Sequence, residues 1–197
     1  YIDTGALYRA IGLCALRAGA DPKSGDAVIP LLKGLRLELV HGEEGQRIFM
    51  NGEDVSGLIR TPKVSMAASA ISALPGVRQF LLGMQREIAA RSNCIMDGRD
   101  IGTVILPNAQ VKVFLTASPE NRARRRTKEL LDKGMCVRYE DVLRELTERD
   151  QNDASRDIAP LRPAEDAVFL DNSDMEPRET LAALINIIKH RLGNEII

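Results

Sequence analysis

The sequence predicts an α/β fold in which a parallel sheet is flanked by helices, with a small antiparallel insertion. Three short apolar runs, at residues 94–96, 111–115 and 167–170, alternate with segments of helical periodicity. Runs of this kind are typical of strands buried on both faces of a parallel sheet. A change of period at residues 35–57 predicts the insertion.

The first helices are predicted from apolar spacing and from the residues at their ends. After Asp3-Thr4-Gly5, apolar or small residues recur every three or four positions from Leu7 to Ala18, and Gly19 then ends the pattern. Pro75 is expected to begin another helix, because proline suits the first helical position. Further helices are expected over 119–133, 139–150 and 177–191.

The insertion is predicted from alternation of apolar and charged residues. Leu35, Leu37 and Leu39 alternate with charged residues, which is the period of a half-buried strand. Asn51-Gly52 is a strong hairpin signal, so the chain is expected to turn back there. The predicted organisation has five parts: core at 1–30, insertion at 31–62, core at 63–120, a lid-like helical segment at 121–157, and core with a C-terminal helix at 158–197.

Composition excludes several classes of protein. The 27 basic and 28 acidic residues nearly cancel, which argues against broad nucleic-acid binding. No stretch approaches the roughly 18 apolar residues of a membrane span, and no signal-like segment opens the chain. Cys14, Cys94 and Cys136 are widely spaced and are predicted to be buried, reduced thiols of a cytoplasmic protein. With two histidines, a histidine-based catalytic centre or zinc site is not expected.

Charged residues follow the predicted strands, notably in the segment Asp97-Gly98-Arg99-Asp100. Ligands of open α/β sheets bind beyond the carboxyl ends of the strands, and charges at such an edge are costly unless they pair or serve a ligand. One interpretation is an internal Asp–Arg pair that closes a turn. The other places Arg99 on a phosphate, which a guanidinium binds bidentately, and the acids on a cation or a base.

Other arginines stand where an anion could be received. Arg9 and Arg78 each lie one turn into a predicted helix, although each alone would also fit a solvated surface. Arg149, Asp153 and Arg156 are spaced four and three apart, so a continuing helix would place them on one face. They would form either a salt-bridge ladder with the neighbouring acids or a flap that brings arginines over phosphates.

A further basic run lies between residues 122 and 128, and a solvated helix face is expected for about half of its positions. The run comprises Arg122, Arg124, Arg125, Arg126 and Lys128.

These features occur in the order and spacing of bacterial cytidylate kinase, which the chain resembles along nearly its whole length. The segments that carry the resemblance are Asp3-Thr4-Gly5-Ala6-Leu7-Tyr8-Arg9, Asn51-Gly52-Glu53-Asp54-Val55-Ser56 with Ile59-Arg60, Ala68-Ser69 leading to Pro75, Val77 and Arg78, Asp97-Gly98-Arg99-Asp100-Ile101-Gly102-Thr103-Val104, Glu148-Arg149-Asp150, and Arg156 followed by Ala159-Pro160-Leu161.

The resemblance implies a P-loop nucleoside monophosphate kinase that transfers the γ-phosphoryl group of ATP to CMP or dCMP, with Mg²⁺, in the cytoplasm and as a monomer. No nucleic-acid or membrane partner is expected. The roles it implies fall on residues from all parts of the chain. They are cytosine contacts at Thr4, Ser69 and Asp100; acceptor-phosphate contacts at Arg9, Arg78 and Arg99; sugar contacts at Arg149 and Asp153; Arg156 between the donor and acceptor phosphates; Arg125 towards ATP; and Asp97 as an indirect partner of Mg²⁺.

Three alternatives stay open at this point: a kinase of the same fold for UMP or AMP, a nucleotide-binding module without catalysis, and a structural domain whose arginines only pair with acids. The sequence also departs from the family pattern. The family has a Gly-x-x-x-x-Gly-Lys-[Ser/Thr] loop ahead of the Asp-Thr-Gly segment, and no part of the sequence matches it. We therefore expect the 197 residues to be an incomplete chain that shows little or no turnover by itself.

Overall fold

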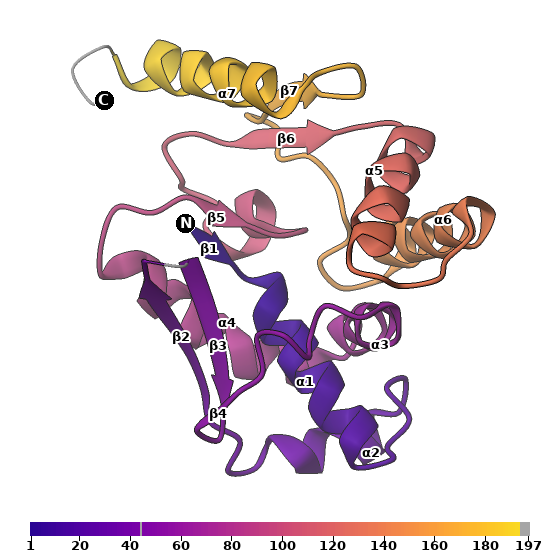
Figure 1. Ribbon diagram of the computed structural model, residues 1–197. Coiled ribbons are helices and arrows are strands. Elements are labelled where there is room, and N and C mark those ends of the chain that lie inside the picture. Colours follow the sequence, from indigo (N-terminus) through magenta and orange to yellow (C-terminus); the bar gives the residue numbers. More distant parts are fainter. Residues whose placement is uncertain (44, 194–197) are drawn as a thin grey trace. The chain divides into compact units, whose positions relative to one another are not determined.

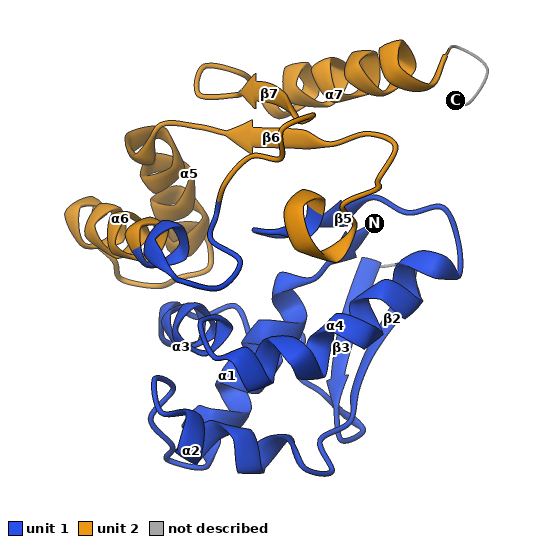
Figure 2. Cartoon of the chain, turned by 180° about the vertical axis from the view of Figure 1, so that it is seen from behind, with its two compact units in different colours: residues 1–101, 152–161 blue, residues 102–151, 162–197 orange. Residues whose placement is uncertain are grey.

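The computed structural model describes residues 1–43 and 45–193. It divides into two compact units, which Figure 2 shows in different colours. Unit 1 comprises residues 1–101 and 152–161, and unit 2 comprises residues 102–151 and 162–197.

The core of unit 1 is built around helices α1 (Gly5–Arg17), α3 (Pro62–Ser72) and α4 (Pro75–Ala90). Each buries an apolar stripe, which includes Leu7, Ile71 and Leu81. The short helix α2 (Gly25–Val28) and the 3-10 helix η1 (Ile29–Leu32) complete this layer (Figure 1). The predicted ends are confirmed, because α1 stops before Gly19, whose φ is +66°, and α4 starts at proline.

The antiparallel insertion is also confirmed, as strands β2 (Leu37–Gly42), β3 (Gly45–Met50) and β4 (Glu53–Asp54). Strands β2 and β3 pair from Leu37↔Met50 to Gly42↔Gly45. Asn51 and Gly52 both have positive φ, at 52° and 84°, which is the backbone form that a tight hairpin turn requires. The buried side chains of Leu37, Ile48 and Met50 attach this sheet to the core of unit 1.

The parallel pairing is confirmed, but it occurs in two short sheets. Strand β1 (Ile2–Asp3) pairs in parallel with β5 (Met96–Asp97) in unit 1, and β6 (Val113–Thr116) pairs with β7 (Val168–Asp171) in unit 2. The remaining elements are a π-helical turn, η2 (Ile101–Ile105), and helices α5 (Pro119–Asp132), α6 (Tyr139–Ser155) and α7 (Pro177–Leu192). Helix α6 runs from unit 2 into unit 1.

Two expectations about burial were wrong. The apolar residues Ile95, Leu115 and Phe169 are exposed. Strand side chains point alternately to the two faces of a sheet, so their burial depends on what covers each face. Phe169 contacts Phe114 across the pair, at 5.3 Å between ring centroids, and still leaves 63% of its surface exposed. Cys136 is likewise exposed, although all three cysteines are free thiols. No helix among the described residues has the length and apolar character needed to cross a membrane.

Two helical glycines of unit 1 allow a matched test of the packing. A Cβ added at Gly12 in α1 would lie 3.1 Å from the Ala68 backbone nitrogen in α3, whereas one added at Gly83 would meet nothing within 4 Å. We expect Gly12→Val to lower the free energy of unfolding by about 1–3 kcal/mol through overpacking. Gly83→Ala should raise it by up to about 1 kcal/mol through helix propensity. Urea unfolding followed by circular dichroism measures both, and equal effects of the two changes would refute the packing argument.

Candidate functional site

Unit 1 buries three charged side chains of the predicted site. Arg78, Asp100 and Asp153 are 8%, 5% and 2% exposed. A buried charge is costly unless it is paired and hydrogen-bonded. Their partners therefore define the site.

Arg78 lies one turn into α4, and its guanidinium forms an ion pair with Asp100. It also donates to the Ser72 carbonyl oxygen, at 3.0 Å, and its central carbon lies 5.8 Å from the centre of the Tyr8 ring. The alternative of a solvated surface arginine is thus wrong for Arg78. Burial raises the pKa of Asp100, and the charges of Arg78 and Arg156 act in the opposite direction.

Asp153 lies in the last turn of α6 and joins three segments of unit 1. Its Oδ1 accepts a hydrogen bond from the Ser69 hydroxyl at 3.1 Å, and its Oδ2 accepts one from Arg99 Nε at 3.0 Å. Arg156 Nη1 lies 3.6 Å from Oδ1. A single carboxylate therefore orients a serine of α3 and two arginines.

Arg156 lies just beyond α6, which ends at Ser155, so it does not share a helical face with Arg149 and Asp153. Its Nε donates to the Ala159 carbonyl oxygen at 2.8 Å, and its Nη1 donates to the Ser72 hydroxyl at 2.7 Å. Its Nη2 is buried and has no hydrogen-bond partner in the described part of the chain. Burial lowers the pKa of Arg156, which the Asp153 carboxylate opposes.

The segment 97–100 is folded against Thr4. The Thr4 hydroxyl donates to the Asp97 carbonyl oxygen at 2.7 Å, and a Cβ at Gly98 would lie 2.6 Å from that hydroxyl. Arg99 pairs with Asp153 and Asp100 pairs with Arg78, both distant in sequence. These pairs replace the internal Asp–Arg turn closure that one interpretation expected.

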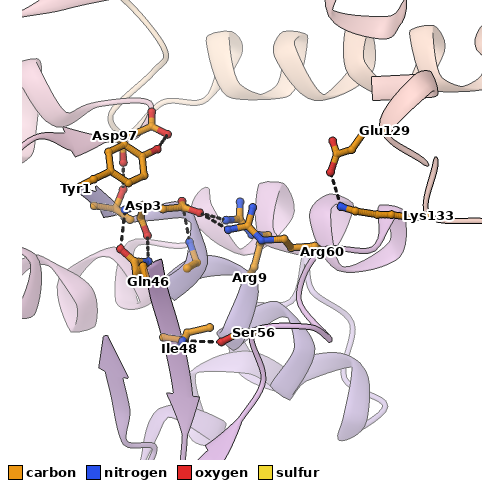
Figure 3. Close-up of polar contacts among 12 residues, drawn as sticks. Tyr1, Asp3, Arg9, Gln46, Ile48, Ser56, Arg60, Asp97, Glu129 and Lys133 are labelled. Atoms are coloured by element: carbon orange, nitrogen blue, oxygen red, sulfur yellow. Dashed lines mark hydrogen bonds and ion pairs between the residues drawn. The ribbon is translucent and has the colours of Figure 1, made fainter. Parts of the chain in front are cut away.

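Arg9 is held by the strand end that precedes its helix. Its Nη2 lies 2.5 Å from Asp3 Oδ2. Figure 3 shows this pair. The Nε of Arg9 is buried and has no hydrogen-bond partner among the described residues. Burial lowers the pKa of Arg9, and the Asp3 carboxylate counteracts this. An anion that approached this guanidinium would relieve the same cost of burial.

Two of the predicted residues, Arg125 and Arg149, belong to unit 2. Arg125 in α5 donates through Nη2 to the carbonyl oxygens of Asn172, Ser173 and Met175, at 2.5, 3.1 and 3.3 Å. These carbonyls belong to the loop that follows β7. Arg149 is partly buried in α6.

The neighbours of Arg149 and Arg125 also form ion pairs. Asp150 pairs with Arg122 at 2.6 Å. Arg126 pairs with Glu129 at 2.7 Å, as expected for a solvated helix face.

Sequence reasoning missed Ser72 and Tyr8, which both contact the arginines of this site. The carbonyl oxygen of Ser72 accepts a hydrogen bond from Arg78, and its hydroxyl oxygen accepts one from Arg156. Ser72 is 7% exposed. The only signal was its position three residues after Ser69, on the same face of a helix. Tyr8 is part of the segment that carries the family resemblance, but the sequence assigned it no role.

Four arginines of the predicted site lie in unit 1, and each is paired with a carboxylate of the same unit: Arg9, Arg78, Arg99 and Arg156. Guanidinium groups bind phosphate oxygens in the same fork geometry as carboxylates. The arrangement can receive a phosphorylated ligand by exchanging partners. The nearby hydroxyl and carboxylate groups of Thr4, Ser69 and Asp100 can recognise a polar base.

The Arg78–Asp100 pair can be tested by a double-mutant cycle. Arg78→Ala should cost about 3–5 kcal/mol of unfolding free energy, because it leaves a buried carboxylate without its cation. The double variant Arg78→Ala/Asp100→Ala should cost clearly less than the sum of the two single changes. Urea denaturation of the four proteins measures the coupling, and additive effects would contradict the pairing.

The family model described as cytidylate kinase matches residues 1–190. A cytidylate kinase of Carboxydothermus hydrogenoformans is 48% identical over 188 residues, which cover 95% of this chain and 85% of the relative.

Relatives from other bacterial groups are similar to the same extent. A cytidylate kinase of Vibrio parahaemolyticus is 45% identical over 192 residues, covering 98% of this chain and 85% of the relative. One of Mycobacterium avium is 46% identical over 192 residues, covering 97% and 84%. With a family match over nearly its whole length and relatives at this identity, the chain belongs to the cytidylate kinase family.

Proposed function

We propose that the protein transfers the γ-phosphoryl group of ATP to CMP or dCMP, and that unit 1 binds the acceptor nucleotide. The observation that carries this proposal is the buried network in which Asp100 pairs with Arg78 and Asp153 holds Ser69 and Arg99. It combines anion-binding guanidinium groups with a carboxylate and hydroxyls that suit a cytosine ring. The name of the family agrees with it.

The cytosine is proposed to contact Thr4, Ser69 and Asp100. The cytosine amino group donates hydrogen bonds, while its N3 and O2 accept them, so the ring needs both an acceptor and donors. Asp100 offers the acceptor, and the two hydroxyls can donate. UMP has a carbonyl in place of the amino group, and its oxygen would face the Asp100 carboxylate unfavourably.

The acceptor phosphate is proposed to contact Arg9, Arg78 and Arg99. Each of these guanidinium groups already lies against a carboxylate, so its position is set before the nucleotide arrives. Exchanging a carboxylate for a phosphate keeps each arginine compensated. The repulsion between the acceptor and the incoming γ-phosphoryl group is thereby offset.

Asp153 and Arg149 are proposed to hold the sugar. An ionised carboxylate accepts hydrogen bonds from both hydroxyls of a ribose, and Asp153 already accepts from a hydroxyl, that of Ser69. Binding the sugar would release Arg99 towards the phosphate. Arg156, whose Nη2 is buried with no hydrogen-bond partner in the described residues, is proposed to bridge the donor and acceptor phosphates.

The donor side involves ATP, Mg²⁺ and the lid-like segment 121–157. The guanidinium of Arg125 donates hydrogen bonds in its own plane to carbonyl oxygens of the loop after β7. We propose that the adenine of ATP stacks on a face of this guanidinium. In kinases Mg²⁺ is held by one or two carboxylates together with substrate phosphates, and it neutralises the charge on those phosphates. Asp97 is an exposed carboxylate at the end of β5 and fits that role through a water, although the described residues contain no cluster of three or more metal ligands. A cytoplasmic monomer is proposed.

The test compares four nucleotides. Isothermal titration should show CMP and dCMP binding to the chain at least about 10-fold more tightly than UMP or AMP, which corresponds to one well-placed polar contact. Arg78→Ala removes a proposed contact with the acceptor phosphate, so this variant should show no measurable CMP binding. The rate at which the full natural protein forms ADP from ATP should also be higher with CMP or dCMP as acceptor than with UMP or AMP.

Each outcome is informative. Preference for AMP or UMP would show a kinase of the same fold with another acceptor. Binding of CMP without formation of ADP would show a nucleotide-binding module. Absence of binding to both the unaltered chain and Arg78→Ala would leave only a structural role for the arginines.

A further inference from the structure

Ser72, the last residue of α3, is not among the residues proposed to contact a substrate. It is buried, and its hydroxyl donates to the Ser69 carbonyl oxygen at 2.7 Å and accepts from Arg156 Nη1 at 2.7 Å. Its own carbonyl oxygen accepts from Arg78 Nη1 at 3.0 Å. One buried residue thus contacts two arginines that are proposed to bind phosphates.

The carboxyl end of α3 attracts positive charge. The last four carbonyl oxygens of an α-helix have no partner within the helix, and the helix dipole is negative there. In α3, backbone nitrogens of the next two residues meet two of these oxygens. The other two, of Ser69 and Ser72, accept from the Ser72 hydroxyl and from Arg78. Arg78 therefore completes the end of the helix, where its charge is favoured.

The two partners of the Ser72 hydroxyl fix its direction. A carbonyl oxygen can only accept and a guanidinium can only donate, so the single proton must point at Ser69 and a lone pair must face Arg156. The hydroxyl is therefore held in one orientation as an acceptor for Arg156. Because it is neutral, it binds this arginine without cancelling its charge, which remains available to phosphates.

The guanidinium of Arg156 is held at two nitrogen atoms. Its Nε donates to the Ala159 carbonyl oxygen at 2.8 Å, and its Nη1 donates to Ser72. The Asp153 carboxylate lies 3.6 Å from Nη1, which is an ion pair longer than a hydrogen bond. A planar group held at two points presents its third nitrogen in one direction. That nitrogen, Nη2, is buried and has no hydrogen-bond partner in the part of the chain that the structure describes.

Ser72 also keeps two like charges in place. Burial lowers the pKa of Arg156, the Asp153 carboxylate opposes this effect, and the charge of Arg78 lowers the pKa further. The two guanidinium groups are therefore close enough to repel each other. Without a shared contact, Arg156 would be free to turn away from Arg78.

We propose that Ser72 is a positioning residue whose hydroxyl directs the Arg156 guanidinium for phosphoryl transfer, while its backbone carbonyl holds Arg78. This inference rests on the proposed function, because it takes Arg156 to bridge the donor and acceptor phosphates. Ser72 itself touches neither nucleotide. A change of its side chain should therefore affect the transfer step and leave CMP binding intact, because the carbonyl oxygen that holds Arg78 is retained.

The test replaces the Ser72 side chain in the full natural protein. Ser72→Ala should lower kcat for ADP formation with CMP about 10-fold, the effect of losing one hydrogen bond to a charged group. The dissociation constant for CMP, measured by titration calorimetry, should change by less than about twofold. Ser72→Cys should lower kcat to the same extent, because a thiol has nearly the same size but is a weak acceptor.

A second background separates positioning from a general effect on packing. Arg156→Met keeps an apolar stem but has no donor, so adding Ser72→Ala to it should lower kcat no further. Ser65 provides a matched control, because it lies in the same helix and its hydroxyl donates to the Thr61 carbonyl oxygen at 2.9 Å. Ser65→Ala should leave kcat and CMP binding unchanged.

An unchanged kcat in Ser72→Ala, a recovered kcat in Ser72→Cys, or a full additional loss in the Arg156→Met background would each overturn the role of Ser72. Absence of CMP phosphorylation by the unaltered protein would instead overturn the proposed function on which the inference rests.

Discussion

The arrangement of unit 1 depends on one requirement, the compensation of the Asp153 carboxylate, which is 2% exposed. Its hydrogen-bond partners come from α3 and from the segment after β5, and Arg156 adds its charge from just beyond α6. Because an uncompensated buried charge costs several kcal/mol, about 3–5 when a partner is lost, these segments cannot separate freely without a replacement. The last turn of α6 is thereby held to unit 1 by the same group that is proposed to bind the sugar.

Under the proposed roles, the same requirement would let a nucleotide bind without leaving a buried charge uncompensated. A phosphate that replaces a carboxylate against a guanidinium exchanges one fork-shaped acceptor for another, so the arginine keeps its hydrogen bonds. The released carboxylate must then find a new donor. For Asp153 that donor would be a sugar hydroxyl, and for Asp100 a cytosine amino group. On binding, the arginines and carboxylates would thus exchange hydrogen-bond partners, and no buried charge would be left without one.

Sequence patterns predicted the features that depend on local chemistry. The ends of α1 and α4, the Asn51-Gly52 turn and the parallel strands followed from glycine, proline and apolar spacing. They could not show that Leu115 and Phe169 would be exposed, because exposure depends on which elements cover the two faces of the sheet. The burial of Arg78 was also hidden, since its partner Asp100 is 22 residues away.

The partners of the charged residues in the candidate site could not be predicted from the sequence either. Motif spacing identified most of the arginines and acids, but it gave no indication of which carboxylate each guanidinium would contact. Asp3 illustrates why. Its neighbours in sequence suggest only a strand end, whereas its backbone is held by Gln46 on β3 and its carboxylate by Arg9 and Arg60. Long-range pairs of this kind follow from the fold as a whole, because their partners come from elements that lie far apart in the sequence.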